Sequence, residues 1–111
     1  MNIEQNYIRV ALVGEDISAS LTPAMHEAEG KELGLHYSYR LIDTNSNATK
    51  IQSLAEIIAK AQSNGYAGLN ITFPYKIQVL QCLDKISRNT KMLGAANTVV
   101  FSGDRKIGYN T

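Results

Sequence analysis

Apolar positions along the chain follow two periods, which predict strands and helices in alternation. Runs that are apolar or alternate with polar residues predict strands at 7–13, 36–42 and 67–72, because side chains two positions apart share one face of a strand. Between the last two strands a helix is predicted, which Asn64–Gly65 ends and to which the polar turn 43–47 can supply an N-cap. Its apolar stripe consists of Ile51, Leu54, Ala55, Ile58 and Ala61.

Turn and cap signals place the remaining elements. Thr22 as N-cap and Pro23 at the first helical position predict a helix that runs to about Leu33. Apolar spacing predicts a short helix at 77–83, which can join another at 87–93, and then a strand at 97–101 that turns back at 102–104. Strands that alternate with helices are typical of a mostly parallel sheet covered on both faces.

We therefore predict an α/β fold in one domain over residues 1–111. It is a three-layer α-β-α arrangement with an open, twisted, mostly parallel sheet and a C-terminal β-hairpin.

The bulk composition excludes several classes of protein. The chain has 111 residues, a formal net charge of +1 and 19% charged residues, so there is no electrostatic basis for binding nucleic acid or an anionic membrane. No apolar run approaches the length of a membrane-spanning helix, about 20 residues, and residues 1–9 lack the apolar core of a signal peptide. The single cysteine, Cys82, excludes an internal disulfide and suits a reducing compartment. We expect a soluble, cytoplasmic domain; homodimer formation stays open.

The densest group of candidate ligand-binding residues follows the third predicted strand. Asn70 and Thr72 are expected to share one face, opposite the apolar residues at 69, 71 and 73. Lys76 comes just after Pro74 has stopped the strand. Ligands of open α/β sheets bind outside the carboxyl ends of the strands. Each of the three polar residues could be an ordinary loop partner or a solvated lysine, but together they favour a binding site.

Three further residues are candidates for ligand binding, each with an alternative explanation. Ser20 and Thr22 flank the predicted start of the first helix, where free N–H groups and the helix dipole favour an anion such as a carboxylate. The alternative is that Thr22 only caps the helix and Ser20 bonds its own loop. Asn97 opens a strand after the small residues 94–96, which permit close backbone approach. Asn97 alone is also typical of a turn.

The sequence lacks the motifs of several common binding and catalytic sites. The sequence contains no Gly-x-Gly-x-x-Gly and no P-loop, so it predicts no nucleotide site of its own. His26 and His36 have no cysteine or carboxylate at metal-ligand spacing, and we expect no metal. Ser18 and Ser20 are not in a Gly-x-Ser-x-Gly elbow.

Four short motifs occur in order along the chain. They are Ser-x-Thr-Pro at 20–23, Asn-x-Thr-x-Pro-x-Lys at 70–76, Gly-Ala-x-Asn-Thr at 94–98, and Gly-x-Asn-Thr at 108–111. Together they resemble the substrate-binding half of the shikimate dehydrogenase family, including its quinate/shikimate members. The resemblance covers the chain from about residue 7 to residue 111.

The resemblance implies a role for each matching residue. It assigns the substrate carboxylate to Ser20 and Thr22, and the ring hydroxyls to Asn70, Thr72 and Asn97. It makes Lys76 the catalytic lysine, acting with an Asp that the family has directly after the position of Thr111. A positioned acid/base group of tuned pKa suits the oxidation of an alcohol, and a lysine at a desolvated strand end beside a carboxylate can provide it.

The family also implies a cofactor and a reaction. Its members reduce 3-dehydroshikimate reversibly to shikimate, a step toward aromatic amino acids. They use NADP or NAD, bound mainly by a following Rossmann domain that is absent from this chain. Because the chain stops inside a motif at Thr111, we expect a fragment cut at a domain junction and inactive by itself.

Two alternatives remain at this stage. The Ser-x-Thr form of the first motif resembles the quinate/shikimate enzymes and some paralogues, so the choice of shikimate or quinate and of NAD or NADP stays open. A non-catalytic module that binds a hydroxylated cyclic carboxylate is the alternative from another functional class.

Overall fold

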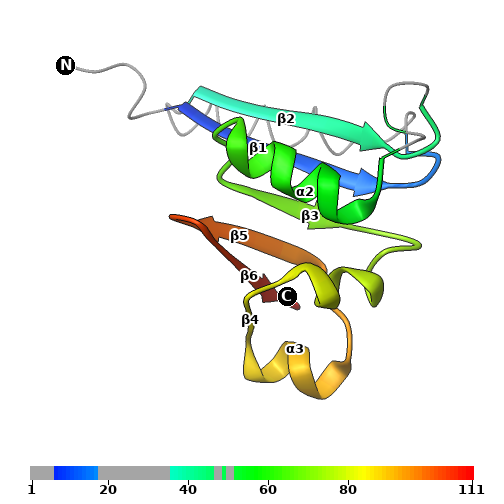
Figure 1. Cartoon of the computed structure of the whole chain (residues 1–111), viewed down its shortest axis with the longest axis vertical. Coiled ribbons are helices and arrows are strands. Elements are labelled where there is room, and N and C mark those ends of the chain that lie inside the picture. The colour runs from blue at the N-terminus through cyan, green and yellow to red at the C-terminus, as the bar shows by residue number, and fades with distance from the viewer. Residues whose placement is uncertain (1–6, 18–35, 47–48, 50–51) are drawn as a thin grey trace.

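The computed structural model describes residues 7–17, 36–46, 49 and 52–111 of the chain. From residue 36 to residue 102, strands and helices alternate (Figure 1). The strands are β1 (Tyr7–Gly14), β2 (His36–Asp43), β3 (Gly68–Ile71), β4 (Lys85–Ile86), β5 (Thr98–Ser102) and β6 (Arg105–Tyr109). The helices are α2 (Leu54–Ser63), the 3₁₀ helix η2 (Gln78–Cys82) and α3 (Arg88–Leu93).

The strands form one sheet in the order β2-β1-β3-β5-β6-β4. β1 is parallel to β2 and β3, β5 is antiparallel to β3 and β6, and β4 is parallel to β6. In the register Asn70 lies opposite Thr98, and Thr98 lies opposite Tyr109. The ends of β1, β3 and β6 and the start of β5 therefore share one edge of the sheet, which we call the carboxyl edge.

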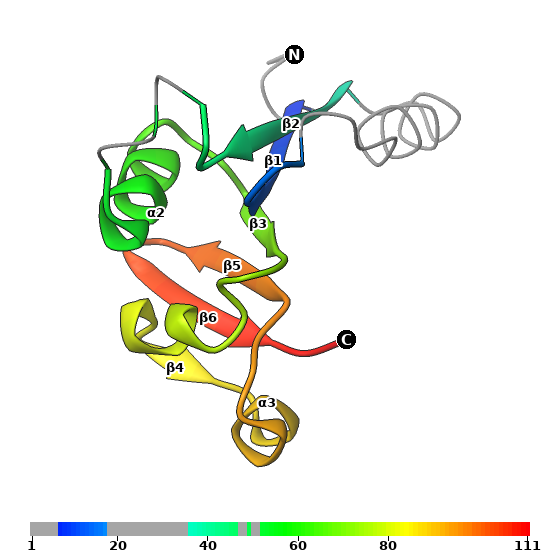
Figure 2. The ribbon, with the colours of Figure 1, turned by 90° about the vertical axis from the view of Figure 1, so that its right-hand side faces the viewer.

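Helix α2 covers one face of the sheet and supplies much of the core. Its N-cap is Ser53, whose hydroxyl accepts from the amide of Glu56 at 3.1 Å, while the Glu56 carboxylate accepts from the amide of Ser53 at 3.3 Å. This capping box, rather than the turn 43–47, starts the helix. In Figure 2, α2 and η2 lie on the same side of the sheet.

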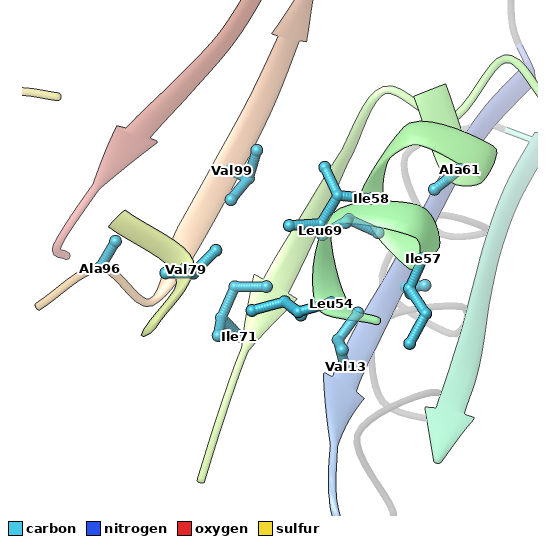
Figure 3. Close-up of a cluster of buried hydrophobic side chains, with 11 residues drawn as sticks. Val13, Leu54, Ile57, Ile58, Ala61, Leu69, Ile71, Val79, Ala96 and Val99 are labelled. Carbon is cyan, nitrogen blue, oxygen red and sulfur yellow. The ribbon is translucent and has the colours of Figure 1, made fainter. Parts of the chain in front are cut away.

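The core lies between this helix and the sheet (Figure 3). Ile58 of α2 is fully buried and points toward Leu69 of β3, which is 2% exposed. Three members of the predicted apolar stripe, Leu54, Ile58 and Ala61, are buried against residues of β1, β3 and β5, together with Ile57. Ala55 is exposed, so its place in the predicted stripe is wrong; it lies on the solvent side of α2. The core consists of Ala11, Val13, Leu54, Ile57, Ile58, Ala61, Leu69, Ile71, Val79, Ala96 and Val99.

The predicted fold class is confirmed, since an open, mostly parallel sheet with helices and a C-terminal hairpin is observed. The helix predicted at 22–33 lies outside the described residues. Phe73 is 72% exposed, so it does not continue the buried face of Leu69 and Ile71 as expected. The reason is that β3 ends at Ile71 and the chain turns at Phe73–Pro74.

The segment after Lys76 differs from the prediction. η2 and α3 do not join, because the short strand β4 separates them. β4 forms through long-range pairing: the amide of Asp84 donates to the carbonyl of Lys106 at 2.8 Å, and that of Ser87 to the carbonyl of Gly108 at 2.9 Å. Local apolar spacing carries no information about such a partner.

Gly94 also has a role other than the expected one. It is the C-cap of α3 in the left-handed region, at φ +70°, and its amide donates to the carbonyl of Thr90. An added Cβ would meet nothing within 4 Å. Gly94 is therefore needed for its backbone conformation and not for close approach.

Candidate active site

The turn after β3 is held by the backbone of neighbouring segments. The amide of Thr72 continues the pairing of β3 by donating to the carbonyl of Val13 at 3.0 Å. The carbonyl of Phe73 accepts a hydrogen bond of 3.1 Å from the amide of Glu15. The turn that leads to Lys76 is therefore tied to the loop after β1.

Two backbone hydrogen bonds hold the segments that contain Lys76 and Asn97 next to each other. The amide of Ala96 donates to the carbonyl of Lys76 at 2.8 Å, and the amide of Ile71 donates to the carbonyl of Asn97 at 2.7 Å. The turn after β3 and the loop before β5 are therefore adjacent at the carboxyl edge. This edge gathers four of the predicted site residues: Asn70, Thr72, Lys76 and Asn97.

The environment of Lys76 differs from the expected one. Its side chain is exposed and has no ion pair with the residues that the structure describes. The expected desolvation is wrong for this part of the chain, because Lys76 lies in a turn beyond the end of β3 and is not covered there. A bound ligand or residues outside the described ranges would have to exclude water from it.

The side chain of Asn97 is largely engaged with the chain itself. Its Nδ2 donates to the carbonyl of Thr111 at 3.0 Å. Its Oδ1 accepts from the amide of Thr111 at 3.2 Å and from the hydroxyl of Thr98 at 2.9 Å. Nearby, Nδ2 of Asn110 donates to the carbonyl of Ala95 at 2.9 Å. Asn97 therefore holds residues 110–111 beside the start of β5 and keeps one N–H for another partner.

Asn70 has a different kind of partner. Its Nδ2 donates a hydrogen bond of 2.7 Å to the hydroxyl of Tyr39, which lies on β2 and is 3% exposed. Asn70 itself is half-buried, and its Oδ1 has no hydrogen bond to a described residue. Its amide oxygen is therefore an open acceptor.

The loop after β1 is anchored by a carboxylate. Asp43, at the end of β2, accepts from the amide of Asp16 at 3.0 Å and from the amide of Ile17 at 3.1 Å. Ser20 and Thr22, which follow this loop in the sequence, lie outside the described residues. Their role in holding a carboxylate stays a prediction.

A groove of about 370 Å³ lies on the face of the sheet opposite α2. Val10, Gly68, Asn70, Thr98 and Val100 are among the residues that line it. A second cavity, of about 190 Å³, lies beside α2 and is lined by Ile57, Lys60 and Tyr66 among others. Of these two, the groove is the better candidate for ligand contact, because Asn70, a predicted site residue, lines it.

Other chemistry has little support in the described ranges. No group of three His, Cys, Asp or Glu side chains there could hold a metal ion. In the same ranges no helix is long and apolar enough to cross a membrane. Cys82 is half-buried, and burial raises the pKa of its thiol above the ordinary value more than the charge of Lys106 lowers it.

Tyr39 and Asp43 were not among the predicted site residues. A usable signal existed for Tyr39, since a tyrosine on a buried strand face requires a partner for its hydroxyl. Asn70, a polar residue on a buried strand, requires one as well. What the sequence could not show is that β2 and β3 flank the same strand.

Comparison with known proteins shows the family to which the chain belongs. The family model described as the shikimate dehydrogenase substrate binding domain matches residues 12–99. The chain belongs to this family. The match confirms the resemblance based on the four motifs.

The most similar relatives include dehydrogenases for both acids. The quinate/shikimate dehydrogenase (NAD(+)) of Corynebacterium efficiens is 51% identical over 94% of this chain and 37% of the relative. The shikimate dehydrogenase (NADP(+)) of Pseudarthrobacter chlorophenolicus is 48% identical over 92% of this chain and 35% of the relative. The chain thus spans little more than a third of these relatives.

Solved structures agree with the family assignment. Quinate dehydrogenase from Corynebacterium glutamicum in complex with NAD superposes with a TM-score of 0.90 at 43% identity, covering 95% of this chain and 38% of that one. Shikimate 5-dehydrogenase from Thermus thermophilus in complex with NADP(H) and shikimate gives a TM-score of 0.82 at 33% identity, covering 93% and 37%. The chain has the fold of the substrate-binding domain of these NAD(P)-dependent oxidoreductases.

Proposed function

We propose that the full-length protein is an oxidoreductase that interconverts 3-dehydroshikimate and shikimate with NADP or NAD, and that this chain binds the substrate. The observation that carries the proposal is the convergence of Asn70, Thr72, Lys76 and Asn97 at the carboxyl edge of a sheet in this family. Two of the relatives described above act on shikimate or quinate according to their names.

Each side chain has a proposed task that its chemistry allows. The open Oδ1 of Asn70 and the hydroxyl of Thr72 hydrogen-bond ring hydroxyls of the substrate, and the remaining N–H of Asn97 can donate to another. Ser20 and Thr22 hold the carboxylate. These contacts orient the ring so that one hydroxyl lies beside Lys76.

Lys76 is proposed to exchange the proton of that hydroxyl. An ammonium or amine within hydrogen-bond reach can donate or accept the proton as the carbonyl is reduced or the alcohol is oxidised. Exclusion of water from the exposed Lys76 would come from the bound substrate and from parts of the protein beyond the described residues. The family pattern assigns a carboxylate next to it, after the position of Thr111.

The residues that the structure describes form no cradle for a dinucleotide cofactor. The sequence has no Gly-x-Gly-x-x-Gly, and the amides of Asp16 and Ile17 in the loop after β1 already donate to Asp43. We therefore assign no cofactor contact to the described residues and derive no hydride step from them. The cofactor would bind mainly outside this chain.

Quinate is a second candidate substrate. The relative at 51% identity is named for quinate and shikimate together, and the structure with a TM-score of 0.90 is a quinate dehydrogenase bound to NAD. The Ser-x-Thr form at 20–22 agrees with this comparison. An enzyme that accepts both acids and prefers NAD is therefore the alternative to a strict shikimate enzyme with NADP.

Initial rates of the full-length protein test the proposal. We would measure the initial rates of oxidation of shikimate and of quinate, each with NAD and with NADP. The protein would be expressed in a host that lacks its own shikimate dehydrogenase. The Lys76→Ala variant is the control for contaminating activity. Turnover of either acid would support the proposal, and the preferred pair would decide between the candidates. Folded protein without turnover of any pair would contradict it.

A further inference from the structure

Tyr39 is not one of the predicted site residues, but it lies where it can act on one of them, Asn70. It belongs to β2, while Asn70 belongs to β3, and β1 runs between these strands. In the register Tyr39 lies opposite Val10, and Val10 lies opposite Gly68, two positions before Asn70. Side chains two positions apart share a face, so Tyr39 and Asn70 are on the face opposite α2. The Tyr39 side chain reaches along this face, over β1, to Asn70.

In the observed hydrogen bond between them, one end of the Asn70 amide stays available to a ligand. Nδ2 donates to the Tyr39 hydroxyl at 2.7 Å, so Oδ1 must point away from Tyr39. Oδ1 has no hydrogen bond to a described residue, and Asn70 also lines the groove of about 370 Å³. The terminal torsion of an asparagine is broad, so without such a partner the amide plane could rotate away from the orientation in which Oδ1 faces a ligand.

We propose that Tyr39 is a positioning residue that holds Asn70 with its amide oxygen toward the ligand, so that Asn70 accepts a hydrogen bond from a ligand hydroxyl. Because Tyr39 is 3% exposed, the packing around it holds its hydroxyl in one place. An amide fixed in this way favours a ring hydroxyl, which can donate, over a keto oxygen, which cannot. The inference rests on the proposed function insofar as the ligand is a hydroxylated ring.

The Tyr39→Phe variant of the full-length protein tests the role, because it removes only the hydroxyl. We expect KM for shikimate to rise about three- to tenfold, which corresponds to the net free energy of one modest hydrogen bond. We expect kcat to change by less than about twofold. Tyr66→Phe is the matched control, since Tyr66 is half-buried but lines the cavity beside α2. It should leave KM unchanged.

A double-mutant cycle separates positioning from general packing. If Tyr39 acts through Asn70, then Tyr39→Phe has no further effect on KM in the Asn70→Ala background. An equal effect in both backgrounds would show that Tyr39 only supports the fold, and the proposal would be overturned. An unchanged KM for Tyr39→Phe in the wild-type background would overturn it as well.

A measurement that needs no activity keeps this inference distinct from the proposed function. In NMR spectra of the wild-type protein, the side-chain NH₂ of Asn70 should exchange slowly with water and have a fixed orientation. This should hold even if neither shikimate nor quinate is turned over. A rapidly exchanging, freely rotating Asn70 amide would overturn the proposal even if Tyr39→Phe failed to fold.

Discussion

The amide of Ala96 donates to the carbonyl of Lys76 at 2.8 Å, which fixes the loop before β5 against the turn after β3. Ala96 is fully buried, so this contact is anchored in the core and not at a mobile surface. The position of the Lys76 backbone relative to Asn97 is thereby set by the fold before any ligand binds. Such preorganisation is what a substrate site requires.

We predict that Lys76→Ala in the full-length protein lowers kcat by about 10²–10⁴-fold, the range for loss of a general acid/base, and changes KM much less. Steady-state kinetics with the preferred substrate and cofactor would measure this. Lys91→Ala is the control, because Lys91 is also exposed but lies on α3. Near-normal turnover of Lys76→Ala would refute the catalytic assignment.

We predict that Thr22→Val weakens substrate binding by about 1.5–3 kcal/mol, the value of a hydrogen bond to a charged group. Valine keeps the shape of threonine and removes its hydroxyl. Thr22→Ser restores the hydroxyl and should recover most of the affinity. Calorimetric titration with shikimate would measure both variants. If Thr22→Val bound as tightly as wild type, Thr22 would be only a helix cap.

Ile58 and Ile77 form a matched pair for stability, since Ile58 is fully buried and Ile77 is 70% exposed. We predict that Ile58→Ala costs about 2–5 kcal/mol through lost burial and a residual cavity. Ile77→Ala should cost no more than about 0.5 kcal/mol. Thermal unfolding of the full-length variants would show the difference. Equal losses would mean that α2 does not pack on the sheet as observed.

Cys82 should respond to pH in a direction that its surroundings determine. Because burial raises the pKa of its thiol above the ordinary value, we expect alkylation by iodoacetamide at pH 8 to be slower than in unfolded protein. Lys106→Gln removes a charge that lowers this pKa, so alkylation should become slower still. The folded state disfavours the thiolate, so its free energy of unfolding should fall as the pH rises past the ordinary value. Mass spectrometry of the Cys82 peptide would measure the rates, and a faster reaction in the folded protein would contradict the prediction.

Much of this protein is determined by its sequence alone. The period of the apolar residues predicted α2 and the strands β1, β2 and β3, since a buried face must repeat with the period of its element. Asn64–Gly65 and the turn 102–104 marked boundaries through local backbone preferences, which act within a few residues. Asn70, Thr72 and Lys76 could be grouped because they are neighbours along a strand and the turn that follows it.

Only the tertiary structure decided the relationships between distant segments. The insertion of β5 between β3 and β6 placed Asn97 beside Lys76, and pairing with β6 created β4 where local spacing allowed a continuous helix. The hydrogen bond from Asn70 to Tyr39 likewise depends on strand order. Strand partners are selected by packing and backbone hydrogen bonding between segments far apart in the chain, and no local pattern records that choice.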